Sequence, residues 1–187
     1  MRFFYTAILT IGAMCTTSTA YAQIDTRRLV KAQMPPTLNM TDTVGYLKIE
    51  GIDGEVSSSN YKKWIGVLDY SIEVKSVPSS GGRSSGRAKF SDFEIVKSID
   101  VASPDLAIYV ASGRHIPKVE FEIKKGNRQY LIEMGDVVVT SVSIKNSGSG
   151  WPQERVSFSY GKIKWQYKSA NGMSTDRTWS VDRNRME

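Results

Sequence analysis

The sequence contains one cysteine and one histidine, and both scarcities limit what the protein can do. Cys15 lies in a leading segment that we expect to be removed, so the remaining chain has no disulfide framework. His115 alone cannot supply the histidine and cysteine ligands of a zinc site. The twelve-residue calcium loop and the P-loop are both missing from the sequence. We therefore expect no metal and no cofactor.

Long apolar runs are also scarce. The one such run covers Phe3–Met14, follows Arg2 and precedes the small-residue pattern Ala20-Tyr21-Ala22. This layout is typical of a secretory signal peptide, and the apolar run is too short to span a membrane. We predict cleavage between Ala22 and Gln23, which gives a secreted or periplasmic protein without membrane insertion after cleavage. An uncleaved anchor and a lipoprotein signal are the alternatives.

The chain divides into three parts on composition. Residues 1–22 form the predicted signal peptide, residues 23–43 contain a Pro-Pro pair and form an extended arm, and residues 44–187 form a single domain. The formal net charge is +6, but Lys and Arg are interleaved with Glu and Asp along the chain. This spread is typical of a solvated surface, so we expect no nucleic-acid partner.

Alternation of apolar and polar residues dominates the chain from Val44 onward. It is clearest in "KVEFEIKK", where Val119, Phe121 and Ile123 share one phase. The segment "RQYLIEMGDVVVTSVSIKN" predicts two strands or one bent strand. In "RVSFSYGKIKWQY" the apolar residues change from one alternating set to the other at Gly161, and in "WIGVLDYSIEV" they do so near Leu68, which indicates bulges. Many strands and one short helix predict a sandwich or barrel.

The helix is predicted in "SPDLAIYVASG". Ser103 suits the N-cap, the following Pro-Asp suits the first turn, and Gly113 suits a left-handed stop. His115 follows two residues after this stop and two before Pro117. We interpret it as part of the structural turn, where it satisfies free helix carbonyls.

Catalysis is not favoured. Gly82–Gly86 spells the G-x-S-x-G pattern of a nucleophile elbow around Ser84, but the exit "RAKFSDFEIVK" predicts a strand where an elbow needs a helix. We expect no catalytic residues. Two alternatives stay open: a secreted hydrolase that uses His115 as its base, and a glycosidase whose two carboxylates come from distant positions in the sequence. Trp151 and Trp179 lie in polar company, where exposure would allow stacking on a sugar or base, or burial against a neighbouring subunit.

An ordered set of segments matches a known family. The segments "YLKIEGIDGE", "SPDLAIYVASGRHIP", "VEFEIKK", "ERVSFSYGKIKWQY" and "RTWSVDRNR", from about Val44 to Arg185, resemble the Hcp family, the tube-forming proteins of bacterial type VI secretion systems. The run Ser112–Pro117 is similar to the family's turn of serine, glycine, a basic residue, histidine and proline.

The resemblance implies a fold and a role. The fold is a mainly β, closed β-barrel of two antiparallel sheets with one short α-helix on the side, and six copies form a ring that stacks into a secreted tube. The implied partners are further copies of the chain as a homohexamer, other type VI secretion components and small protein cargo. The implied contact loops contain Ser79, Ser80, Gly81, Gly82, Arg83, Ser84, Ser85, Gly86, Arg87 and Trp151.

The signal peptide departs from this family pattern, because tube subunits are normally loaded from the cytoplasm. It leaves a second interpretation open, in which the protein is an exported ring or barrel that binds a protein or glycan in the periplasm or outside the cell.

Overall fold

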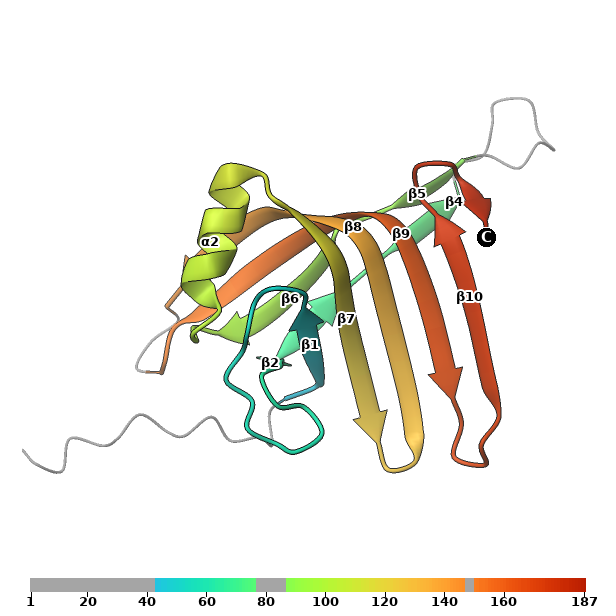
Figure 1. Ribbon diagram of the computed structural model, residues 1–187, viewed down its shortest axis with the longest axis horizontal. Helices are drawn as coiled ribbons and strands as arrows, with labels where there is room; N and C mark the ends of the chain where they lie inside the picture. Colours follow the sequence, from blue (N-terminus) through green and yellow to red (C-terminus); the bar gives the residue numbers. More distant parts are fainter. Residues whose placement is uncertain (1–42, 77–86, 147–149) are drawn as a thin grey trace, which may run out of the picture. The chain divides into compact units, whose positions relative to one another are not determined.

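A computed structural model of the chain describes residues 43–76, 87–146 and 150–187. Strands dominate this part, and one helix, α2, lies between the sixth and seventh strands (Figure 1). The mainly β architecture with a short helix is therefore confirmed. The elements are β1 (Gly45–Ile49), β2 (Ile65–Val67), β3 (Asp69–Ser71), β4 (Val74–Ser76), β5 (Ala88–Phe90), β6 (Phe93–Ser98), α2 (Ser103–Ser112), β7 (His115–Lys125), β8 (Arg128–Lys145), β9 (Gln153–Lys168), β10 (Ser174–Ser180) and β11 (Arg185–Met186).

Nine of these strands form one antiparallel sheet. The order along its main path is β11-β10-β9-β8-β7-β1-β2, with β6 attached to β9 and β3 attached to β6. The remaining two strands, β4 and β5, pair with each other as a separate ribbon. No helix in the described residues is long and apolar enough to cross a membrane.

The predicted closed barrel of two sheets is wrong, because the hydrogen-bonded ladders do not close. Strand β2 pairs with β1, whereas β3 pairs with β6. The chain changes partner at Leu68, whose N–H donates to the carbonyl of Val96 over 2.8 Å. Among the described strands none pairs with both β1 and β6, so the ladder is interrupted at the position where the apolar phase changes.

Strands β8 and β9 form the longest ladder of the sheet, with a register irregularity between Val139 and Ser141. Strand β8 is continuous, so of the two alternatives predicted for this segment, two strands or one bent strand, the second is correct. One end of β9 pairs with β6 and the other pairs with β10. The change falls around Gly161, where Tyr160 and Ile163 are both buried although they have opposite parity. Asp136, in β8, adopts a positive φ of 54° near this point, which aspartate tolerates better than most residues.

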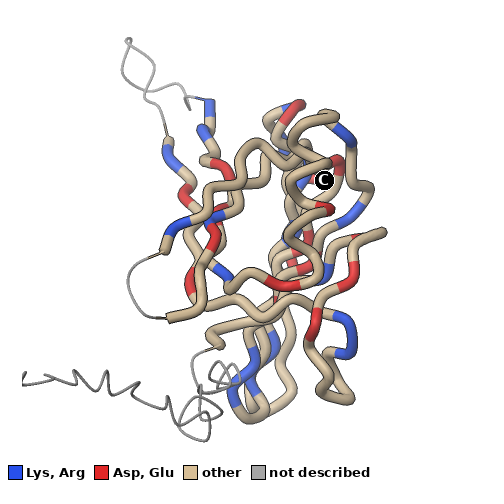
Figure 2. The backbone as a smooth tube through the Cα atoms, turned by 90° about the vertical axis from the view of Figure 1, so that its left-hand side faces the viewer, with Lys and Arg blue, Asp and Glu red and all other residues tan. Residues whose placement is uncertain are grey.

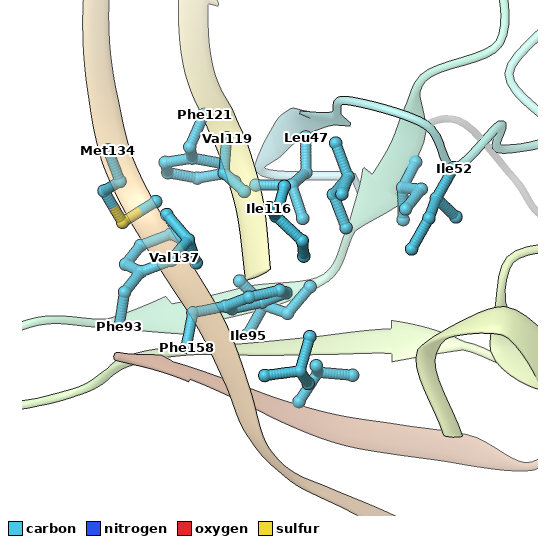
Figure 3. Close-up of a cluster of buried hydrophobic side chains, with 14 of the residues drawn as sticks. Leu47, Ile52, Phe93, Ile95, Ile116, Val119, Phe121, Met134, Val137 and Phe158 are labelled. Carbon is cyan, nitrogen blue, oxygen red and sulfur yellow. The ribbon is translucent and has the colours of Figure 1, made fainter. Parts of the chain in front are cut away.

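The core lies inside the bend of this sheet. Figure 3 shows side chains from β1, β6, β7, β8 and β9 converging in it. The ring of Phe93 lies 5.3 Å from that of Phe121 and 6.3 Å from that of Phe158, so three strands meet through aromatic contacts. All three side chains are fully buried.

Helix α2 packs through Leu106 and Tyr109, which are buried, and it contacts β8. Its N-cap is Ala102 rather than the predicted Ser103. The Ser103 hydroxyl instead accepts the Asp100 N–H and donates to Glu154 Oε1 over 2.7 Å. The serine therefore fixes the start of the helix to the sheet.

A buried ion cluster joins β6, β9 and this helix start. The Lys97 side chain has no exposed surface, and its Nζ lies 2.7 Å from Glu154 Oε1 and 2.6 Å from Asp100 Oδ1. The ammonium also donates to the carbonyl of Ser98 over 2.9 Å. Glu154 Oε2 has no hydrogen-bond partner within the part of the chain described. The Lys97 ammonium therefore has an acceptor for each of its three N–H groups, as a buried charge requires.

Replacing Lys97 by methionine is expected to lower the free energy of unfolding by about 3–5 kcal/mol, because it leaves two buried carboxylates without their cation. Urea denaturation measures this change. The matched control is Lys75→Met, since Lys75 pairs with Glu73 at a site where both side chains are more than half exposed. The control should change stability little. Equal effects in the two variants would contradict the structural role of the cluster.

Candidate functional site

Trp151 lies at the end of the sheet where β6 and β8 end and β9 begins, since Gln153 is in register with both Ser98 and Lys145. Its indole N–H donates to the carbonyl of Ile99 over 2.8 Å. The side chain is nevertheless 53 % exposed. The ring is therefore fixed in orientation and still open to solvent.

Further exposed apolar side chains come from elements at this end. Val101 leads into α2, Ile108 lies on α2 and Ile144 lies near the end of β8; each is more than half exposed. We call the end of the domain that carries these three residues and Trp151 the helix-side surface. Large apolar groups exposed on neighbouring elements are typical of contact surfaces between proteins. Sequence reasoning identified only Trp151, because Ile108 and Ile144 follow the same apolar patterns as buried residues.

The predicted structural turn is divided between two elements. Gly113 adopts a φ of 61° and ends α2 in the left-handed conformation. Its N–H donates to the carbonyl of Val110, and the Arg114 N–H donates to that of Tyr109. The free helix carbonyls that His115 was predicted to satisfy are thus already bonded to backbone N–H groups.

His115 and Pro117 belong to β7 rather than to the turn. The imidazole Nδ1 lies 2.8 Å from Asp136 Oδ1, and both side chains are about two-thirds exposed. Pro117 lies between two residues that pair with Val137 and Gly135, which places it opposite Asp136 where the ladder is irregular. A proline lacks an N–H, so it suits a position where the ladder skips a donor.

The predicted contact loop is only partly described. Ser79–Gly86 lies outside the described residues, and so does the signal cleavage position between Ala22 and Gln23. The candidate nucleophile Ser84 falls in the same range. Arg87 is exposed, and the next N–H, of Ala88, donates to Asn184 Oδ1 over 3.2 Å.

Trp179 is half-buried, and its ring contacts an aromatic side chain of its own chain, whereas its polar neighbours in the sequence allowed either exposure or burial against another subunit. Its ring lies 6.4 Å from that of Phe90, which also lies 6.3 Å from that of Trp165. The indole nitrogen of Trp179 is buried and has no hydrogen-bond partner in the described residues. These contacts give the ring a packing role beneath the β4–β5 ribbon.

The outward face of the sheet carries paired charges. Lys118 lies 2.8 Å from Glu120 and 3.3 Å from Glu133, and Lys164 lies 3.4 Å from Asp176. The hydrogen bond to Glu120 raises the pKa of the Lys118 ammonium above its usual range. Basic and acidic residues are interspersed along the strands (Figure 2). Within the described ranges no group of acidic, histidine or cysteine side chains has the arrangement of a metal site.

The chain is similar to known proteins. The family described as "Type VI secretion system effector, Hcp" matches residues 46–167. A comparison with curated proteins gives no match.

Solved structures with the same fold include three with informative sequence identity. Hcp1 from Salmonella typhimurium is 28 % identical, with a TM-score of 0.66 over 76 % of this chain and 97 % of that one. A type VI secretion system effector from Yersinia pestis is 30 % identical, with a TM-score of 0.64 over 73 % and 99 %. Hcp2 from Salmonella typhimurium is 26 % identical, with a TM-score of 0.61 over 75 % and 98 %.

The family match covers well over half of the chain, and the structural matches cover nearly the whole of each relative. The chain therefore belongs to the Hcp family of type VI secretion system tube proteins.

Proposed function

We propose that the protein is a structural subunit that assembles as a ring of six copies, and that these rings stack into a secreted tube. The family match over residues 46–167 carries this proposal. A ring requires one surface of each copy to meet a different surface of the next, and the same subunit grows a filament through its ring faces. Such a protein works through contacts, so we propose no enzymatic activity.

The helix-side surface supports the proposal. Trp151 is held by a hydrogen bond to the backbone while about half of the residue stays exposed, so it loses little side-chain freedom when a partner covers it. Tryptophan is also among the residues that most often dominate interface energies. We place a contact between copies at this surface, and a second contact at the loop that ends at Arg87.

The partners that follow are further copies of the chain, other type VI secretion components and small protein cargo. The leading segment supports a different second candidate, because its composition is that of a secretory signal peptide. In that case the domain is an exported binding module, for a protein or glycan, outside the cytoplasm.

The mass of the purified protein in solution tests the ring. Multi-angle light scattering over a range of concentrations is expected to give six copies. Trp151→Ala should shift the equilibrium towards smaller species, because it removes an exposed aromatic contact of the kind that contributes about 2 kcal/mol or more to an interface. Met186→Ala, at another exposed apolar side chain, is the control and should leave the hexamer intact. A wild-type monomer at all concentrations would rule out the ring.

Shortening the Ser79–Arg87 loop tests the contact between rings. Rings should form normally, while tubes seen by negative-stain electron microscopy become short or absent, because the loop no longer reaches its neighbour. Normal tubes from this variant would remove the role we assign to the loop.

The N-terminal residue of the protein isolated from the producing cell tests export. Cleavage after Ala22 predicts a chain that begins at Gln23, detected by intact-mass spectrometry of the periplasmic or culture fraction. A chain in the cytoplasm that begins at Met1, or at Met34 or Met40, would favour loading from the cytoplasm and count against the exported binding module.

A further inference from the structure

Two hairpin turns lie side by side at one end of the strands (Figure 1). One connects β7 to β8 and the other connects β9 to β10. A groove of about 280 Å³ runs between them. Its lining residues include Lys124, Lys168, Asn127, Gln129 and Ser169. The Ser169 hydroxyl donates within its own turn, to Asn171 Oδ1 and to the carbonyl of Met173, so towards a ligand it acts as an acceptor. No described acidic residue lines it.

The strand register brings the two lysines to one face of the sheet. Gln129 is paired with Lys124 on one side and with Lys168 on the other. Neighbouring strands lie about 4.8 Å apart, so the two lysine backbones are about 10 Å apart with the glutamine between them. Two lysine side chains at this separation reach a common anion, and the amide between them reaches the same ligand.

The β7–β8 turn carries further positive charges that no carboxylate of the described residues neutralises. Lys125 and Arg128 are paired across the β7–β8 turn, next to Lys124. Among the described residues, none of these three cations nor Lys168 forms an ion pair with a carboxylate.

The lysines farther along β7 and β9, in contrast, form ion pairs with carboxylates. Lys118 in β7 pairs with two glutamates, and Lys162 and Lys164 in β9 pair with Glu187 and Asp176. Protein carboxylates therefore neutralise the lysines in the middle of the strands and leave the turns positively charged. The positive potential at the turns raises the local concentration of anions from solution.

We propose that this groove binds a phosphate monoester carried on a hydroxyl-bearing group, such as a phosphorylated sugar. Lysine binds phosphate as a point charge, side-chain amides both donate to and accept from sugar hydroxyls, and the Ser169 hydroxyl accepts from them. The groove is slightly smaller than pockets that hold drug-sized ligands, which suits one sugar unit. The residues that line the groove all come from one copy of the chain.

Titration calorimetry with glucose 1-phosphate, glucose and inorganic phosphate tests the site on the purified protein. Glucose 1-phosphate should bind more tightly than either fragment. The double variant Lys124→Gln/Lys168→Gln should weaken this binding at least about tenfold, since each lysine supplies a charged contact to phosphate. The control is Lys75→Gln/Lys89→Gln, which removes the same charge from a cross-strand pair on the β4–β5 ribbon. The control should bind like the wild type.

Amide NMR shifts of Ser169 and Gly172 on addition of glucose 1-phosphate locate the ligand. Binding of vesicles that contain phosphatidic acid, compared with pure phosphatidylcholine vesicles, distinguishes a membrane-borne phosphate monoester from a soluble one. Three results would overturn the proposal: no binding of glucose 1-phosphate at millimolar concentration, equal loss in the site and control variants, or glucose 1-phosphate binding no tighter than inorganic phosphate.

Discussion

The antiparallel ladder between β8 and β9 is the constraint on which the rest of the domain depends. These two strands pair along their whole length, and β6, β7, β10 and α2 are all attached to one of them. A ladder of this length would be flat or simply twisted if its side-chain phase were constant. The change of phase at Gly161 instead turns both halves of β9 towards one core, since Tyr160 and Ile163 are both buried.

The buried Lys97 cluster fixes the helix to this ladder. An ion pair between Lys97 and Glu154 joins two neighbouring strands, and Asp100 and Ser103 extend it to the start of α2. Burial of a charge is costly, so such a cluster adds little net stability compared with apolar packing. Its effect is geometric, because the ammonium is satisfied only when the helix start and both strands are in place.

The surface is organised by position along the strands. Trp151, Ile108 and Ile144 are exposed at the end where α2 lies, and paired charges lie in the middle of the strands. Unpaired cations lie on the turns at the other end of β7, β8 and β9, together with the exposed Met173. Apolar surface is favourable for contacts that persist between copies, whereas unpaired cations favour exchangeable anions. The proposed contact between copies and the proposed phosphate site thus rest on different kinds of surface.

The sequence by itself determined the strands, the helix with its glycine stop, the bends and, through an ordered set of segments, the family. These features depend on local propensity and on side-chain period, which are properties of neighbouring residues. Lys97 follows the buried phase set by Phe93 and Ile95, but no local signal reveals that Glu154, 57 residues away, is its partner. Only the tertiary structure decided that partner, the contact of His115 with Asp136 and the open ladder at Leu68. Each depends on which distant strands become neighbours, and that is fixed by packing of the whole core.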